Sequence, residues 1–173
     1  SRGAWVPPAN QTIRSALALS RELGADEQAG LYERAINFLR PGPHGYVLGS
    51  ASTLSEDPDL EPIGVRRLLI LLRRLALREG QLYVFAPHSQ AFRRRVARGF
   101  ERVLAEMFTR GAFAGSDPAQ AYRVVVDETL NTTYSVEQGR FVVELRVAPA
   151  QPLMFITVRL IQSGPETLTV QEV

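Results

Sequence analysis

The chain has 173 residues, of which 45% are hydrophobic, and its 20 basic and 18 acidic residues leave a formal net charge of only +2. This length suits one domain with its own core, no apolar run is long enough to span a membrane, and the small charge argues against a general polyelectrolyte binder. Every basic residue is Arg, and Lys and Cys are absent. Pyridoxal phosphate enzymes, Walker-type phosphate binding, disulfides and thiolate metal sites are thereby excluded.

The first ten residues are expected to form an extended arm, because Trp5, Pro7 and Pro8 disfavour a helix there. The chain opens with Ser1 rather than Met, and no charged and then apolar signal follows. We therefore expect a single domain, residues 1–173, excised from a longer protein.

Short elements are expected next. Residues 12–23 have a moderate helical spacing that would equally fit a strand. Asp26 is a good helix N-cap and has the acidic Glu27 beside it. In chain order we expect a helix from Asp26 to about Glu33, strands at residues 36–39 and 46–50, and an acidic loop at residues 55–62.

Two long helices are predicted in the middle of the chain. The first, Val65 to Glu79, is apolar on most of its circumference, and Gly80 is expected to end it. Ser89 can cap the second, in which apolar residues recur at helical spacing and should face the core: Phe92, Val96, Phe100, Val103, Leu104 and Met107. Its arginines Arg94, Arg95, Arg98 and Arg102 lie on the opposite side.

Strand patterns follow. Apolar and polar residues alternate in residues 122–127 and 141–147, so each strand should bury one face, and residues 153–161 form the next strand. The turn between Pro149 and Pro152 favours an antiparallel pair. We predict an α+β fold, with a mainly antiparallel sheet, two long helices packed on one face and extended terminal arms.

The last ten residues, 164–173, also alternate with the period of a strand, and Leu168 and Val170 are the apolar positions. Such a terminal strand either folds back on its own sheet or adds to the sheet of a neighbouring chain, and spacing alone leaves both open. For the second case, the candidate subunit-interface strand consists of Leu168, Thr169, Val170 and Gln171.

No catalytic, cofactor or metal site is indicated. The only histidines, His44 and His88, each lie next to a proline in a predicted turn, and a hydrolase that uses His88 would lack a Gly-x-Ser-x-Gly elbow. The acidic residues of loop 55–62 lack the central glycine and distal glutamate of a calcium loop. We expect no cofactor.

The arginines of the second helix are the remaining candidate for binding. Arg94, Arg98 and Arg102 are spaced four residues apart and therefore repel one another. This repulsion suggests an anionic surface opposite them, unless Glu79, Glu101 and Glu106 neutralise it. A solvated face, a nucleic acid and an acidic protein surface all remain open, although a nucleic-acid site would need more positive charge and exposed aromatic residues.

An ordered set of segments resembles the C-terminal domain of contractile tail sheath proteins, found in contractile phage tails and R-type pyocin-like injection systems. The similar segments are residues 3–10, 51–55, 65–80, 83–88, 111–115, 127–131, 139–149 and 152–156. Ala86 and His88 depart from the residues that the family usually has.

The resemblance implies a non-enzymatic structural subunit of a virion tail or tail-like particle, assembled in the bacterial cytoplasm. Its implied partners are identical sheath subunits in a helical array, an inner tail tube protein and a baseplate, with no membrane insertion and no nucleic acid. Terminal strands would pair with neighbouring sheets, and Arg94, Arg95, Arg98 and Arg102 would contact the tube or another partner.

Overall fold

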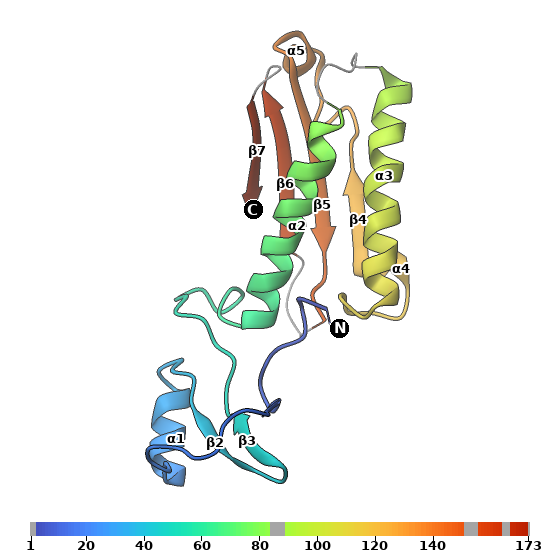
Figure 1. The fold of residues 1–173 in the computed structure, drawn as a ribbon. Helices are drawn as coiled ribbons and strands as arrows, with labels where there is room; N and C mark the ends of the chain where they lie inside the picture. Colours follow the sequence, from blue (N-terminus) through green and yellow to red (C-terminus); the bar gives the residue numbers. More distant parts are fainter. Residues whose placement is uncertain (1–2, 84–88, 151–155, 164–166, 173) are drawn as a thin grey trace. The chain divides into compact units, whose positions relative to one another are not determined.

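The computed structural model describes residues 3–83, 89–150, 156–163 and 167–172 (Figure 1). The chain forms two compact units, Ser1–Arg67 and Leu68–Val173, each with its own antiparallel sheet. The predicted α+β class is confirmed. No helix in the described ranges is both long enough and apolar enough to cross a membrane.

The first unit holds a small sheet in the order β1-β3-β2, and one helix. Its elements are β1 (Thr12–Ile13), α1 (Ala25–Tyr32), β2 (Leu39–Gly42) and β3 (Gly45–Leu48). The N–H group of Asn10 donates to the carbonyl of Leu48 at 2.8 Å, which ties the end of the N-terminal segment to β3. The predicted strands at 36–39 and 46–50 are displaced by up to three residues, and the turn between them lies at Pro43 and His44.

Helix α1 begins before the predicted cap at Asp26. Gly24 is the N-cap residue, and its N–H group donates to the carboxylate of Glu27 at 3.0 Å. The acidic residue three positions into the helix therefore replaces a capping side chain. None of the residues of α1 is buried.

Two long helices cover the sheet of the second unit. Helix α2 (Ile63–Gln81) continues from the first unit into the second, and α3 (Gln90–Thr109) follows. The hydroxyl of Ser89 accepts from the N–H group of Phe92 at 3.1 Å, as predicted for the cap. The buried residues of α3 are Phe92, Val96, Phe100, Leu104 and Met107, whereas Val103 is half-buried.

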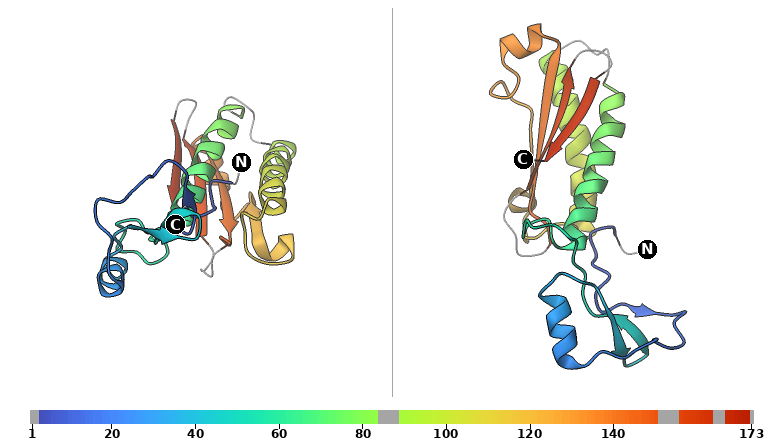
Figure 2. Two further views of the ribbon diagram at one scale, coloured as in Figure 1. Left: turned by 60° about the horizontal axis from the view of Figure 1, so that its bottom comes forward. Right: turned by 90° about the vertical axis from the view of Figure 1, so that its left-hand side faces the viewer.

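The second sheet has the order β4-β5-β6-β7 and is antiparallel throughout. Its strands are β4 (Tyr122–Val125), β5 (Arg140–Val147), β6 (Ile156–Ser163) and β7 (Thr167–Glu172). Two short helices, α4 (Pro118–Ala121) and α5 (Thr133–Glu137), precede β4 and β5. Both views in Figure 2 place α2 and α3 on the same face of this sheet, as predicted. The first three residues of the predicted strand 153–161 lie outside the described residues.

Gly80 does not end α2, which was the expectation, because the helix continues through Gln81. A Cβ atom on Gly80 would lie only 2.7 Å from Cδ2 of Leu168 and 3.3 Å from Cδ2 of Leu160. The missing side chain therefore allows α2 to pack closely against β6 and β7.

Strand β5 is buried on both faces, whereas the alternation predicted one wet face. Val143, Leu145 and Val147 belong to the core, but Val142 and Glu144 on the other face are also buried. On this face Asn131 bonds to the backbone of Val142, and Arg146 and Arg159 pair with Glu144.

Candidate interaction surfaces

The predicted terminal strand exists as β7, and in this single chain it pairs with β6. Leu160 lies opposite Val170, Ile161 opposite Thr169, and Gln162 opposite Leu168. Folding back on the chain's own sheet is thus the arrangement found here, one of the two that the sequence left open. The transfer of β7 to a neighbouring chain stays a prediction.

The side chains of β7 divide by face. Leu168 and Val170 are half-buried, and Leu168 rests against Gly80 of α2, whereas Thr169 and Gln171 are exposed. On its other side β7 has no strand partner among the described residues. One row of backbone hydrogen-bonding groups is thus open for a further strand.

The four predicted contact residues of α3 are all exposed. Within the described part of the chain, the side chains of these four residues make no hydrogen bond and no ion pair, although their backbone belongs to helix α3. Arg94 lines one hollow next to β4, and Arg98 and Arg102 line a second one. Arg95 and Arg102 act electrostatically on Tyr83.

Tyr83 lies across α3 because Gly99 leaves room for it. A Cβ atom on Gly99 would be 2.6 Å from the Tyr83 hydroxyl. Burial and the nearby Glu79 raise the pKa of Tyr83, and Arg102 and Arg95 oppose this change. The phenol ring also meets Phe92 edge to face, with 5.9 Å between the ring centroids.

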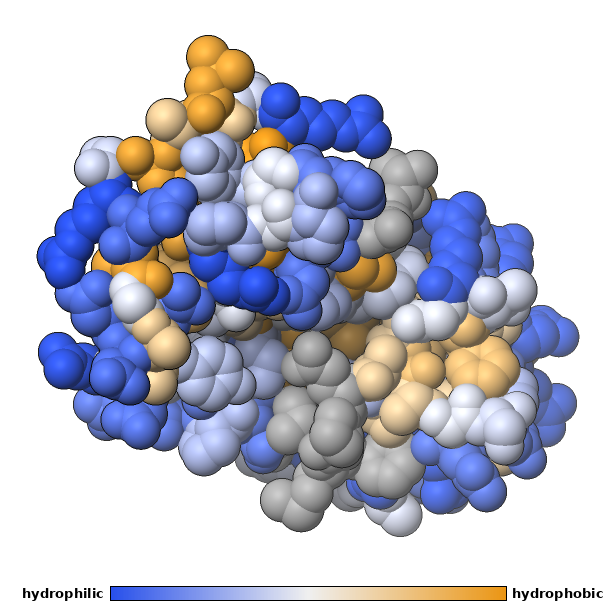
Figure 3. All heavy atoms as spheres, turned by 90° about the horizontal axis from the view of Figure 1, so that it is seen from below, coloured by the Kyte–Doolittle hydropathy of each residue, from blue (hydrophilic) through white to orange (hydrophobic). Residues whose placement is uncertain are grey.

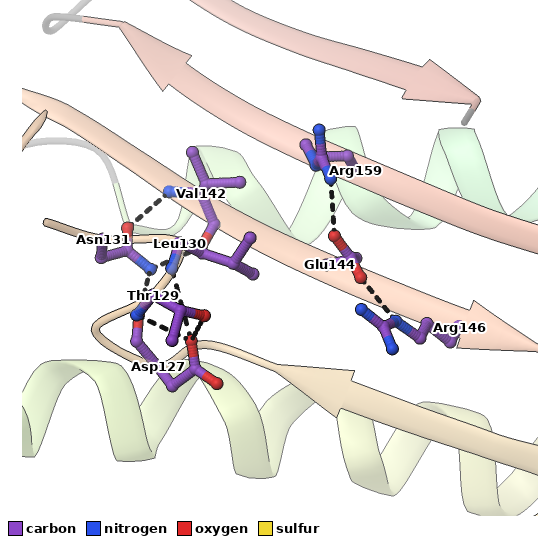
Figure 4. A network of polar contacts seen from close by, with 8 residues as sticks. All are labelled: Asp127, Thr129, Leu130, Asn131, Val142, Glu144, Arg146 and Arg159. Atoms are coloured by element: carbon purple, nitrogen blue, oxygen red, sulfur yellow. Dashed lines mark hydrogen bonds and ion pairs between the residues drawn. The ribbon is translucent and has the colours of Figure 1, made fainter.

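The loop after β4 is held by its own side chains (Figure 4). The carboxylate of Asp127 accepts from the N–H group of Thr129 at 3.0 Å and from its hydroxyl at 2.5 Å. The hydrogen bond from the Thr129 side chain is the main reason why the pKa of Asp127 is lowered, and backbone bonds from Leu130 and Thr129 add to it. This turn carries the chain to Asn131.

A buried carboxylate lies further along β5. Glu144 accepts from Nε of Arg146 at 2.5 Å and from a terminal guanidinium nitrogen of Arg159 at 2.8 Å (Figure 4). Burial alone would raise the pKa of Glu144, but the hydrogen bonds from Arg159 and Arg146 outweigh it, and the pKa is lowered. Two arginines share one carboxylate, so this face of the sheet keeps a surplus positive charge.

Large exposed hydrophobic side chains are separate from one another in the sequence, and Leu17 and Leu54 are the most exposed. Figure 3 shows one face of the molecule, on which hydrophobic residues lie between hydrophilic ones. Among the described residues, no group of three or more His, Asp or Glu side chains could hold a metal ion. The candidate surfaces are thus a strand edge and an arginine-bearing helix.

Comparison with curated proteins finds similarity to tail sheath proteins of phages. The chain is 28% identical over 165 residues to the tail sheath protein of Enterobacteria phage T4, a match that covers 92% of this chain and 24% of that protein. No family model matches.

Solved structures agree. One similar structure is the sheath complex of an extracellular contractile injection system, PVC, in its contracted state. The chain superposes on it with a TM-score of 0.83 and 27% identity, over 88% of this chain and 44% of that chain. For the contracted helical sheath of the anti-feeding prophage, the TM-score is 0.79 and the identity 30%, over 89% of this chain and 44% of that chain.

The resemblance to a contractile tail sheath domain, inferred from the sequence, is confirmed by these matches. Its relatives are sheath components of a phage tail and of tail-like particles. The chain spans about a quarter of the length of the curated relatives and less than half of each solved chain.

Sequence reasoning missed Asn131 and Glu144. The Asp127-Glu-Thr129 turn signal precedes Asn131, but nothing in the sequence shows that its amide would reach β5. Glu144 stood out only as the one acidic residue in an otherwise apolar and basic strand.

Proposed function

We propose that the chain is the structural unit of a contractile tail sheath, which assembles with identical subunits in a helical array around an inner tail tube. The observation that carries this proposal is the sequence match with a phage tail sheath protein over nearly the whole chain, supported by the fold shared with two contracted sheaths. Contraction of such a sheath drives the tube through a target envelope. The chain performs no catalysis in this role.

Terminal strand β7 is the element that we assign to contact between subunits. It is a single strand at the sheet edge, it pairs on one side only among the described residues, and it follows a short connection after β6. Backbone pairing can survive large rigid-body rotations of domains, because the linkers bend while the strand ladder persists. Leu168, Thr169, Val170 and Gln171 form the interface strand of this proposal.

The exposed arginines of α3 are assigned to partner contact by charge complementarity. Exposed ion pairs contribute little each, roughly 0.2–1 kcal/mol, so a tube surface held in this way could be released during contraction. Arg94, Arg95, Arg98 and Arg102 have no ion-pair partner within the described residues, which leaves their charges available for a partner.

The other implied partners follow from the same assignment. One of the matched structures is a baseplate of the anti-feeding prophage, and a baseplate at the end of the sheath is the third protein partner that we propose. Assembly would take place in the bacterial cytoplasm, and the mature location is a virion tail or a tail-like particle. Neither membrane insertion nor a nucleic acid has a part in it.

Assembly can be tested by producing the chain together with the products of its flanking genes and examining purified particles by electron microscopy. We expect a sheathed tube that contains the chain, and we expect a variant without residues 164–173 to remain folded but to leave bare tubes. Unchanged sheaths from the shortened variant would contradict the role of β7. Particles that lack the chain altogether would contradict the proposed function.

A further inference from the structure

The face of the second sheet that points away from α2 and α3 gathers arginine side chains. Successive residues of a strand point to opposite faces, so Glu144 and Arg146 lie on the face opposite the core residue Leu145. Arg123 of β4 is directly opposite Arg146. Arg159 of β6 is directly opposite Glu144. Three arginines from three neighbouring strands thus lie around one buried carboxylate, and we call this surface the arginine face.

The shared carboxylate leaves guanidinium donors without a partner. Each oxygen of Glu144 accepts from one arginine, from Arg146 at 2.5 Å and from Arg159 at 2.8 Å, and the two arginines approach it from either side (Figure 4). Nε of Arg159 is buried and has no acceptor in the described part of the chain. A buried donor without an acceptor costs free energy. Because 32% of the Arg159 side chain is exposed, its guanidinium can turn toward an oxygen supplied by a partner.

The acidic residues near the arginine face do not cancel its charge. Arg123 acts electrostatically on Asp127, although the two form no ion pair in the described ranges. Glu128, the next residue, is engaged by Arg93 at 3.4 Å instead. With Glu144 and Asp127 both counted, three arginines face two carboxylates. The surface is therefore positive and fits a partner surface that carries carboxylates.

The chain itself carries such a surface. Its second unit, Leu68–Val173, holds 13 arginines and ten acidic residues, whereas Ser1–Arg67 holds seven arginines and eight acidic residues. Four of those eight lie together in residues 55–61, which we call the acidic loop: Glu56, Asp57, Asp59 and Glu61. None of the four has an ion pair among the residues that the structure describes. The first unit thus presents a negative loop, and the second presents a positive face.

Hydrogen bonds within the acidic loop fix its shape. The N–H group of Thr53 donates to the carbonyl of Glu61 at 2.6 Å and closes the loop. Inside it, the carboxylate of Asp57 accepts from the N–H group of Asp59 at 2.9 Å. Leu54, at its start, is 89% exposed. A loop that is already ordered loses little conformational freedom when it binds, so its carboxylates are available at low entropic cost.

We propose that the arginine face binds the acidic loop of a second copy of this chain. The inference rests on the proposed function, which brings copies together, and it adds a contact made by side chains. The loop belongs to the first unit and the face to the second, so a copy can present its loop to one neighbour and its face to another, as an open helical array requires. Single exposed ion pairs are weak, so the contact depends on several charges acting together and on salt.

The test measures self-association of the whole chain by sedimentation velocity at about 0.05 M salt. The sedimentation coefficient of the wild type should rise with protein concentration, and about 0.5 M salt should abolish the rise. The loop variant, Glu56→Arg with Asp59→Arg, should associate at least about tenfold more weakly. The face variant, Arg123→Glu with Thr157→Glu, should lose association to the same extent. It leaves Glu144 with both of its arginine partners.

A mixture of the two variants tests whether the contact joins different copies. In equal amounts they should associate again, because the arginines of one loop then meet the glutamates of the other face. Two controls carry matching charge changes at exposed positions and should leave association unchanged: Glu22→Arg with Glu33→Arg, and Arg73→Glu with Gln81→Glu. Circular dichroism checks that each variant is folded, and the loop variant alone still tests the contact if the face variant is not.

Three results would overturn the inference: a wild-type chain that stays monomeric at low salt, variants that associate like the wild type, or a mixture that does not recover. A contact within one chain would give the last result, because it recovers only when both changes are in the same chain. The outcome is separate from that of the particle experiment. If particles contain the chain and the loop variant builds the same sheaths, the proposed function stands and the contact assigned here is wrong.

Discussion

Asn131 and Val142 are joined by two hydrogen bonds that imitate a pair of strand residues. Oδ1 of Asn131 accepts from the N–H group of Val142 at 2.8 Å, and Nδ2 donates to the Val142 carbonyl at 2.9 Å. Strand β4 has ended at Val125, so no backbone reaches Val142 on that side. The side-chain amide of a buried residue takes the place of the missing strand.

Replacing Asn131 by Ala should lower the free energy of unfolding by about 2–4 kcal/mol, because both backbone groups of Val142 would lose their partner while buried. Urea denaturation measures the change. Thr133→Ala, at an exposed position two residues away, is the control and should change stability by less than about 0.5 kcal/mol. A loss of under about 1 kcal/mol at Asn131 would show that water reaches the site and replaces the amide.

Glu144 should make the free energy of unfolding depend on pH. Its pKa is lower in the folded chain than in the unfolded chain, so it contributes stability above the ordinary pKa of glutamate, about 4.3, and loses that contribution as the pH falls through the folded value. Glu144→Gln should cost about 1–3 kcal/mol at pH 7 and reduce the slope of stability against pH below about pH 4.5.

Asp127 adds to the same acid dependence, because its pKa is also lowered. Asp127→Asn is therefore the comparison variant, and the Glu144→Gln protein should keep the part of the slope that belongs to Asp127. Thermal unfolding between pH 2.5 and 7 measures both. An unchanged acid slope in Glu144→Gln would mean that its two arginines do not hold the carboxylate ionised.

Gly80 and Leu168 should be energetically coupled. Gly80→Ala places a methyl group 2.7 Å from Leu168, which should cost about 1–2 kcal/mol. In a Leu168→Ala background the two closest contacts are gone and only Cδ2 of Leu160, at 3.3 Å, remains near the new methyl group. The same change should then be between neutral and about 1 kcal/mol stabilising. The double-mutant cycle, followed by urea denaturation, tests this; equal effects in both backgrounds would contradict close packing of α2 on β7.

The chain should not bind nucleic acid with useful affinity, because its net charge is only +2 and the arginines of α3 have no interleaved exposed aromatic residues. A gel-shift titration with double- and single-stranded DNA at about 0.1 M salt checks this. A salt-sensitive shift that disappears when Arg94, Arg98 and Arg102 are changed to Ala would instead favour a nucleic-acid binding module.

The spacing of apolar residues predicted the helices and strands whose buried face it defines. The core face of α3, its cap at Ser89 and the succession of strands in the second half of the chain were all predictable, because apolar spacing and capping chemistry are local properties. The end of α2 was not predictable, because glycine is read as a helix terminator when nothing shows that Leu168 will lie against it.

The candidate surfaces were predictable in part. The exposed side of α3 follows from its helical spacing, but the division of its arginines depends on where β4 and Tyr83 lie. The burial of Glu144 was missed because its partner Arg159 lies on another strand, fifteen residues away. Contacts between residues far apart in the sequence decide which charged side chains are buried, and the alternation of apolar and polar residues does not predict those contacts.

The most direct test of strand donation uses the absence of cysteine from these 173 residues. Cysteines introduced at Gln162 and Leu168 face one another on β6 and β7 of the single chain, so mild oxidation of the isolated protein should link them within one chain. In assembled sheaths, the account predicts that this internal link no longer forms, because β7 lies in the sheet of a neighbour. Complete linkage within each chain of an assembled sheath would contradict it.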